Sequence, residues 1–82
     1  MDAAGPRSPV EARLERTVRA SYGRLLAILA APDGDIASAE DALADALERA
    51  LRRWPRDGIP DNPEGWLLTV ARNRLRDLYR SA

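Results

Sequence analysis

The stretch SAEDALADALERALRRWPRDGIPDNPEGWLLTVARNRLRDLYR, residues 38–80, decides the fold of this chain. Its pattern predicts an acidic helix, a turn rich in proline and glycine, and an arginine-rich helix led by a tryptophan. The whole chain has no net charge, but residues 33–48 hold six acidic side chains and no basic one, whereas residues 66–82 hold four arginines and one acid. Such sorting predicts two faces for two different partners, one of which could be a nucleic acid.

Three helices are predicted from the spacing of the apolar residues, which recur at helical intervals in three separate segments. These segments span about residues 10–31, 36–54 and 63–80. Asp35 stands where it can cap the second helix, and Asn62, followed by Pro63, is typical of the start of the third. The prolines and glycine of residues 54–62 indicate a turn-rich loop between the second and third helices.

The composition favours a single all-α domain. Among the 82 residues there is no Phe and there are only two Trp and two Tyr, so the core has to be built mainly from Leu, Ala, Val and Ile, and Leu and Ala are strong helix formers. We therefore expect a compact three-helix domain over residues 10–82, behind a disordered tail over residues 1–9. No signal peptide and no membrane-spanning run is visible, which predicts a cytoplasmic protein.

The residue types that are missing argue against catalysis. The chain has no Cys, which excludes a disulfide framework and a thiolate metal site, and no His, the commonest general base and zinc ligand. The acids of the second helix match neither a calcium loop, which needs a central Gly, nor a di-metal bundle, which adds Glu-x-x-His motifs. We therefore expect no enzyme, no metal site and no cofactor.

The second helix carries an acidic face. Its members share the side of the helix opposite the apolar residues, and no base interrupts them. They are Glu40, Asp41, Asp45 and Glu48. A solvated surface is the usual explanation for such a face, and a docking face for a basic partner is the sharper alternative.

The third helix carries an arginine stripe, which is the strongest candidate site. Arg72, Arg76 and Arg80 recur every four residues, with Asn73 beside them. Guanidinium groups one turn apart can each meet a phosphate, and Asn can hydrogen-bond a base edge. The spacing by itself slightly favours the alternative, a solvated face with cations near the negative end of the helix dipole. Arg74 lies closer to the apolar side and is expected to fold onto an acid of another helix.

The two tryptophans flank the loop between the second and third helices. Trp66 could stack an unpaired base, although an aromatic side chain that covers the open end of the core is the favoured interpretation. Trp54 is expected to lie in the core, under the same loop.

Two sequence blocks resemble region 2 of bacterial RNA polymerase sigma factors of the extracytoplasmic-function group. Residues 39–47, AEDALADAL, are similar to the family's A-E-D-hydrophobic-x-Q-D/E-x-hydrophobic, and residues 66–77, WLLTVARNRLRD, to W-L-x-x-I/V-A-R/K-N-x-x-I/L-D. The linking residues 48–63 look like the subgroup whose longer members carry a C-terminal helical-repeat extension. Both blocks occur in the family's order and at its separation, and the resemblance covers about residues 22–80.

The resemblance implies roles for both faces in transcription initiation. The first block would dock on the coiled coil of the core RNA polymerase clamp, and the second would melt and hold the non-template strand of the promoter's minus-ten element. The implied polymerase-binding residues are Glu40, Asp41, Asp45, Glu48, Arg49 and Arg52. The implied DNA-binding residues are Asn62, Trp66, Arg72, Asn73, Arg76, Asp77 and Arg80. Loop residues 56–61 would form the wall of a pocket for a flipped base, whose extrusion costs a few kcal/mol.

The sequence also departs from the family pattern. Ala44 stands where the family often has Gln, and aromatic residues near the loop are few. No second helix-turn-helix for the minus-thirty-five element is visible, so we expect either a domain excised from a longer protein or a protein that cannot select promoters alone. An anti-sigma factor is a further candidate partner, and no membrane partner is expected. The alternative from another class is a small helical protein–protein interaction module that never touches DNA; such a module has no need for Asn73 between Arg72 and Arg76.

Overall fold

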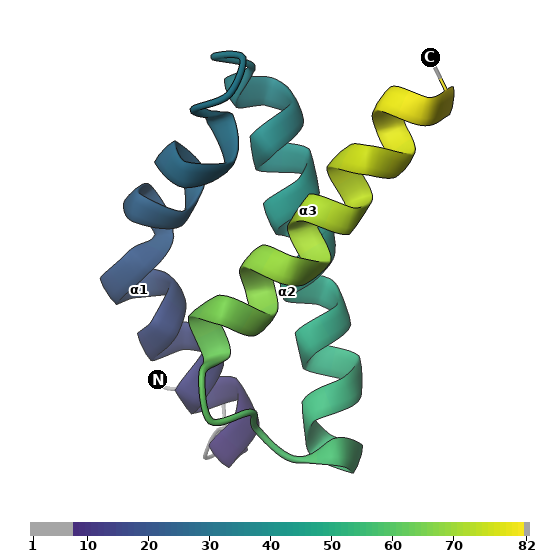
Figure 1. Cartoon of the computed structure of the whole chain (residues 1–82). Coiled ribbons are helices and arrows are strands. Elements are labelled where there is room, and N and C mark those ends of the chain that lie inside the picture. Colours follow the sequence, from purple (N-terminus) through teal and green to yellow (C-terminus); the bar gives the residue numbers. More distant parts are fainter. Residues whose placement is uncertain (1–7, 82) are drawn as a thin grey trace, which may run out of the picture.

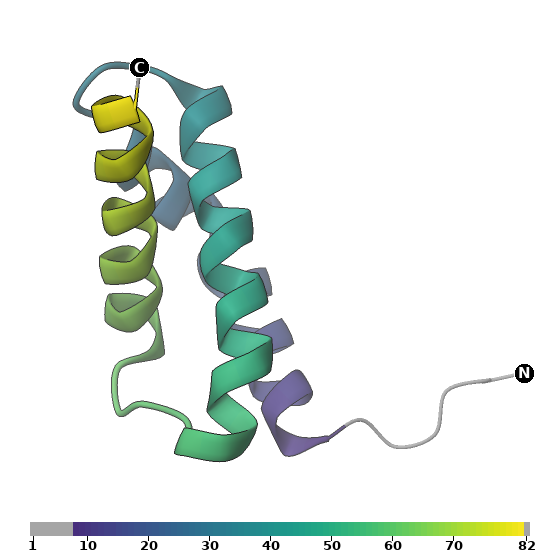
Figure 2. The same cartoon turned by 90° about the vertical axis from the view of Figure 1, so that its right-hand side faces the viewer.

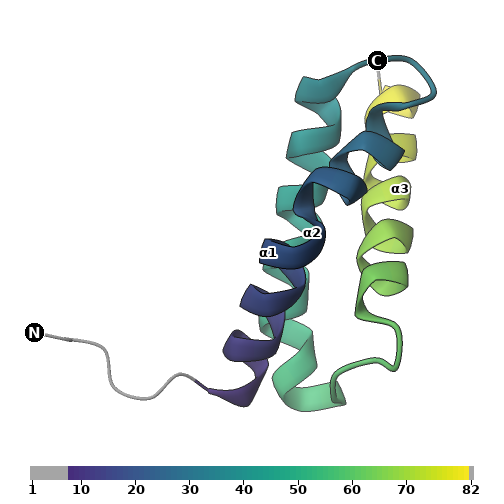
Figure 3. The same cartoon turned by 90° about the vertical axis from the view of Figure 1, so that its left-hand side faces the viewer.

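The computed structural model describes residues 8–81, and these form three α-helices without any strand. The helices are α1 (Pro9–Ala30), α2 (Ile36–Asp57) and α3 (Pro63–Ser81). Figure 1 shows α3 crossing in front of α2, and Figures 2 and 3 show that α2 runs in the direction opposite to both other helices. The predicted all-α three-helix fold is confirmed.

The first helix begins slightly earlier than the apolar spacing predicts. Ser8 and Glu11 form a capping box, in which the Ser8 hydroxyl accepts from the Glu11 amide at 3.1 Å and the Glu11 carboxylate accepts from the Ser8 amide at 3.3 Å. Pro9 occupies the first helical position, where its missing N–H is not needed. Ser8 and Pro9 therefore belong to the start of α1 and not to the predicted tail, of which residues 1–7 lie outside the described residues.

The second helix ends later than predicted. Asp35 caps its start as expected, accepting from the Ser38 amide at 3.0 Å and from the Ser38 hydroxyl at 2.7 Å. The prediction that the loop starts at Trp54 is wrong, because α2 continues through Pro55. A proline this near the end removes one helical hydrogen bond at an exposed turn, where water can replace it. Gly58 then ends α2 with a φ of 92°, and its amide donates to the Trp54 carbonyl at 2.9 Å.

The core lies on both sides of α2, the helix that packs most closely against its neighbours. Four alanines of this helix are fully buried, so α1 and α3 can approach its backbone from two directions. The largest fully buried side chains are Trp54, Leu25, Leu43 and Leu67, which come from all three helices. The predicted burial of Trp54 is confirmed, with 2% of its surface exposed. This core holds α2 and α3 antiparallel, with the five-residue loop 58–62 at one end.

Candidate nucleic-acid interface and acidic docking face

The acidic face predicted on α2 forms a continuous exposed surface. Glu40, Asp41 and Glu48 are exposed and Asp45 is half-buried. The two arginines that the resemblance adds to this face neutralise part of it. Arg49 pairs with Asp45 at 3.0 Å, and Arg52 with Glu48 at 3.7 Å. Along α2, this face therefore has alternating charges on its C-terminal half and only acids on its N-terminal half, where Arg74 of α3 lies beside Asp41.

Arg74 connects this face to α3. Its guanidinium lies 3.7 Å from the Asp41 carboxylate, which confirms that Arg74 folds onto an acid of another helix. The Nε of Arg74 is buried and has no hydrogen-bond partner among residues 8–81. With 40% of the Arg74 side chain and 60% of the Asp41 side chain exposed, the pair is a surface interaction of less than about 1 kcal/mol.

The arginine stripe of α3 is exposed, and its positive charges have no ion-pair partner among the described residues. Arg72, Asn73, Arg76 and Arg80 all lie on the solvent side of the helix. Within the described part of the chain, none of these three arginines has a hydrogen bond or an ion pair. On α2, by contrast, Arg49, Arg52 and Arg53 each have an acidic partner one turn away. Unpaired guanidinium groups one turn apart are suited to binding a chain of phosphates.

Asp77 is also exposed, and it is the one acidic residue that the resemblance places among the DNA contacts. It already takes part in an interaction within this protein. Its carboxylate lowers the positive charge of the helix near Arg76 and Arg80, so it does not add to phosphate binding.

Asn62 is used to start α3. Its side-chain oxygen accepts from the Gly65 amide at 3.0 Å, and its carbonyl accepts from the Trp66 amide at 3.0 Å, which confirms the predicted N-cap. A Cβ at position 65 would come within 2.7 Å of the side-chain amide nitrogen of Asn62, so the absence of a side chain at Gly65 leaves space for this cap. Only the side-chain NH₂ of Asn62 remains available to a ligand.

Trp66 closes the end of the core next to the loop. Its ring packs edge-on against Trp54, with ring centroids 5.4 Å apart and an angle of 69° between the planes. The side chain is half-buried, in agreement with the interpretation that it covers the core. Trp66 follows Asn62 by one helical turn, and the Asn62 carbonyl accepts from the Trp66 amide.

Comparison with known proteins identifies the family. The family model for sigma-70 region 2 matches residues 17–82, which is most of the chain. The chain belongs to the sigma-70 region 2 family. Domains of this family are parts of sigma factors, which bind core RNA polymerase and promoter DNA in transcription initiation, and they are not enzymes. The resemblance found in the two sequence blocks is thereby confirmed at the level of the family.

One relative of this region 2 domain shows how little of a larger protein the match covers. An uncharacterized protein of Rhizobium meliloti (strain 1021) is 51% identical over 42 residues, which are 51% of this chain and 10% of that protein. The matched segment therefore spans about a tenth of the relative's length. No solved structure matches this chain significantly. Across residues 8–81, no helix combines the length and the apolar character needed to cross a membrane.

Two contacts that fix α3 of the region 2 domain were missed by the sequence analysis. At its start, the Glu64 carboxylate accepts from the buried Ser21 hydroxyl and from the Arg24 guanidinium, both on α1. Near its end, the Tyr79 hydroxyl donates to Asp33 at 2.6 Å, in the loop between α1 and α2. The partners are separated by 40 or more positions in the sequence, so no local pattern could have indicated them.

The contact between Tyr79 and Asp33 predicts that the stability of the fold depends on pH. The hydrogen bond from Tyr79, supported by the Asp35 amide, holds the pKa of the Asp33 carboxyl below its ordinary value of 3.8. A lowered pKa in the folded state stabilises the fold above pH 3.8, and this contribution is lost as the pH falls through the lowered pKa. The same hydrogen bond raises the pKa of Tyr79 above its ordinary value of 10.0. The contribution of Tyr79 to the stability of the fold is therefore lost only as the pH rises through that raised pKa.

Tyr79→Phe should therefore raise the pKa of the Asp33 carboxyl, as measured by an NMR titration of the carboxyl carbons. Asp35 provides the control, because its pKa is lowered mainly by hydrogen bonds from Ser38, which this variant keeps. Only a weaker charge interaction links it to Asp33, so the Asp35 titration should change far less than that of Asp33. An Asp33 titration curve that is identical in both proteins would contradict the contact.

Proposed function

We propose that this domain docks on the clamp coiled coil of core RNA polymerase through α2 and captures the non-template strand of the promoter minus-ten element through α3. The observation that carries the proposal is the difference between the two helices. The arginines of the acidic face on α2 are paired with acids one turn away, whereas Arg72, Arg76 and Arg80 on α3 have no partner within residues 8–81. Free cations on one helix and acids on the other are suited to two partners of opposite charge.

The proposed docking surface is the exposed side of α2. Its acids would meet a basic stretch of the clamp, and its arginines would meet acids placed one turn further along. The residues assigned to it are Glu40, Asp41, Asp45, Glu48, Arg49 and Arg52. Because these side chains are exposed or half-buried, most of their contribution would go to the association rate and to the choice of partner.

The proposed DNA surface follows α3 from its cap to its last turn. The arginines would bind phosphates, Asn73 and the free NH₂ of Asn62 would reach base edges, and the exposed part of Trp66 would stack a base. The residues assigned to it are Asn62, Trp66, Arg72, Asn73, Arg76, Asp77 and Arg80. Residues 56–61, at the end of α2 and in the following loop, would form the wall around a flipped base.

Capture of an unpaired base can open a promoter without covalent chemistry. Flipping a base out of a duplex costs a few kcal/mol, and the cost is lowest where the duplex is already opening. A protein that binds only the flipped state shifts the equilibrium toward it in proportion to its affinity for that state. The rigid cap at Asn62 and the Trp54–Trp66 contact hold the loop side of this surface in place before DNA arrives.

The sequence blocks support a finer assignment as well. We propose an extracytoplasmic-function sigma factor, of the subgroup whose longer members carry a C-terminal helical-repeat extension, acting in the cytoplasm. The blocks at residues 39–47 and 66–77 and the linking residues 48–63 are the features that favour this group. An anti-sigma factor that covers one of the two surfaces is a candidate regulator of such a protein.

Arg76→Ala tests the DNA surface. The variant should bind single-stranded minus-ten oligonucleotides about tenfold more weakly, the usual effect of losing one hydrogen bond to a charged group. The salt dependence should become shallower too, by about 0.7 in the slope of log K against log salt for each phosphate that the protein no longer binds. Fluorescence anisotropy over a range of salt concentrations, using the best binder from a random oligonucleotide library, measures both effects.

Arg19→Ala is the matched control for this measurement. Arg19 is exposed, lies on α1 and pairs with Glu15 at 2.6 Å, so its removal changes the net charge equally without touching α3. Equal affinities and equal salt slopes for the Arg76 variant and the unchanged protein would rule out a DNA role for this face. In that case the domain would be a protein–protein interaction module.

A further inference from the structure

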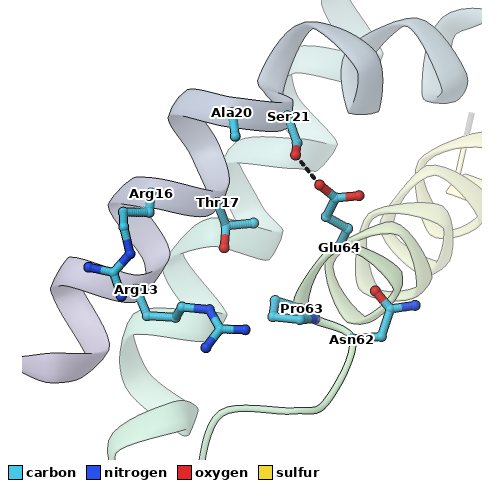
Figure 4. Close-up of a pocket in the computed structure, with 8 residues that line it drawn as sticks. All are labelled: Arg13, Arg16, Thr17, Ala20, Ser21, Asn62, Pro63 and Glu64. Carbon is cyan, nitrogen blue, oxygen red and sulfur yellow. Dashed lines mark hydrogen bonds between the residues drawn. The ribbon is translucent and has the colours of Figure 1, made fainter.

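An open pocket lies between α1 and the start of α3, on the α1 side of the proposed DNA surface (Figure 4). It has a volume of about 320 Å³, enough for a phosphate group. The pocket is lined on α1 by Arg13, Arg16, Thr17, Ala20 and Ser21, and on the other side by Asn62, Pro63 and Glu64. Figure 4 shows the Arg13 side chain extending from α1 toward Pro63.

The pocket carries an excess of positive charge. Arg13 is half-buried and Arg16 is exposed, and across residues 8–81 neither has a hydrogen bond or an ion pair. The other two arginines of α1 are paired, Arg19 with Glu15 and Arg24 with Glu64. The Arg13 guanidinium is open to water and has no counter-ion among residues 8–81, so it is available to pair with an anion in the pocket.

Glu64, the only acid among the described residues that line the pocket, is already neutralised. Its carboxylate accepts from the Ser21 hydroxyl, drawn as a dashed line in Figure 4, and from the Arg24 guanidinium. The Thr17 hydroxyl is an uncharged donor among the lining residues, and Arg13 extends beside it toward Pro63, whereas Arg16 runs along α1 and the Asn62 amide lies on the far side of Pro63 (Figure 4). The pocket therefore offers a phosphate the Arg13 guanidinium and the Thr17 hydroxyl, with Arg16 at its rim.

We propose that this pocket binds a backbone phosphate of the same single strand that α3 and the loop hold. The inference rests on the proposed function, because Asn62 belongs both to this pocket and to the proposed DNA surface. Along α3, Asn62 and Arg76 are about 21 Å apart at 1.5 Å per residue, so the strand would run from the arginine stripe past the loop and onto α1. Arg13 and Arg16 precede residues 17–82, to which the family model applies, whereas Thr17 and Asn62 lie within them.

The test compares Arg13→Ala and Arg16→Ala with Arg19→Ala in single-stranded DNA binding. The two pocket variants should each weaken binding by about tenfold, and the double variant should reduce the salt slope by about 0.7. Arg19→Ala, which removes the same charge from the same helix outside the pocket, should bind like the unchanged protein. Far-ultraviolet circular dichroism checks that each variant is folded.

A second measurement modifies the DNA one phosphate at a time. In each oligonucleotide a single phosphate is replaced by a neutral methylphosphonate. At one position the replacement should weaken binding to the unchanged protein but not to Arg13→Ala, as in a double-mutant cycle. Sensitivity that is equal in both proteins at every position would overturn the proposal. A second result would also overturn it. In that case inorganic phosphate stabilises the protein thermally in a way that depends on Arg13, but Arg13→Ala does not change DNA binding.

The outcomes separate this inference from the proposed function. If Arg76→Ala weakens DNA binding and the pocket variants do not, the phosphate pocket is refuted and the proposed function stands. If the unchanged protein binds no single-stranded DNA at all, both are refuted.

Discussion

Asp41→Arg is expected to abolish binding of the domain to core RNA polymerase while leaving the three-helix fold intact. Asp41 lies in the N-terminal half of the proposed docking surface, where α2 carries acids and no base, and 60% of its side chain is exposed. Reversing its charge would set an arginine against a basic stretch of the clamp, and like charges in an interface cost several kcal/mol, about a hundredfold or more in affinity. The fold should tolerate the change, since only the surface pair with Arg74 is broken. Pull-down of core polymerase by the tagged domain measures the loss.

Arg74→Ala is the control that assigns the effect to the carboxylate. It breaks the same pair at 3.7 Å and leaves Asp41 in place, so it should still bind polymerase. If both variants lose binding, the surface depends on the geometry that the pair holds. If Asp41→Arg binds normally, the docking assignment for α2 is wrong.

Trp54→Ala is expected to remove a large share of the domain's free energy of unfolding. Trp54 is the largest fully buried side chain, it is 2% exposed, and it supports Trp66 at the loop. Removing a buried aromatic side chain costs about 3–5 kcal/mol. The total stability of an 82-residue domain is about 4–12 kcal/mol, so this one change removes a large share of it. Chemical denaturation followed by circular dichroism measures the difference.

Trp54→Phe and Trp66→Ala show which property of Trp54 matters. The indole nitrogen of Trp54 is buried and has no hydrogen-bond partner in the described part of the chain, so the phenylalanine variant loses volume but no hydrogen bond and should cost much less. Trp66 is only half-buried, and its loss should also cost less than that of Trp54. A Trp54→Ala domain as stable as the unchanged one would contradict the assignment of this residue as the centre of the core.

The helices and their caps could be predicted from the sequence because they depend on neighbouring residues. The apolar spacing predicted three helices, and Asp35 and Asn62 cap the second and third as expected. The end of α2 was predicted wrongly, because the rule that proline ends a helix is weak in the last turn, where few hydrogen bonds remain to be broken. The exposed stripe and the acidic face followed from the same helical periodicity.

Apart from Arg74, whose pairing with an acid of another helix was predicted, the state of the arginines could not be predicted from the sequence, because it depends on residues far apart in the chain. The same residue type is free at Arg76, paired across helices at Arg74, and unpartnered but half-buried at Arg13 within the described residues. The sequence by itself determined the three helices, the core faces and the two charged faces, since helical spacing and capping act over about one turn. Only the tertiary structure decided which arginines stay free, how Ser21 and Arg24 neutralise Glu64, and where α1 meets the start of α3, because packing on α2 brings these segments together.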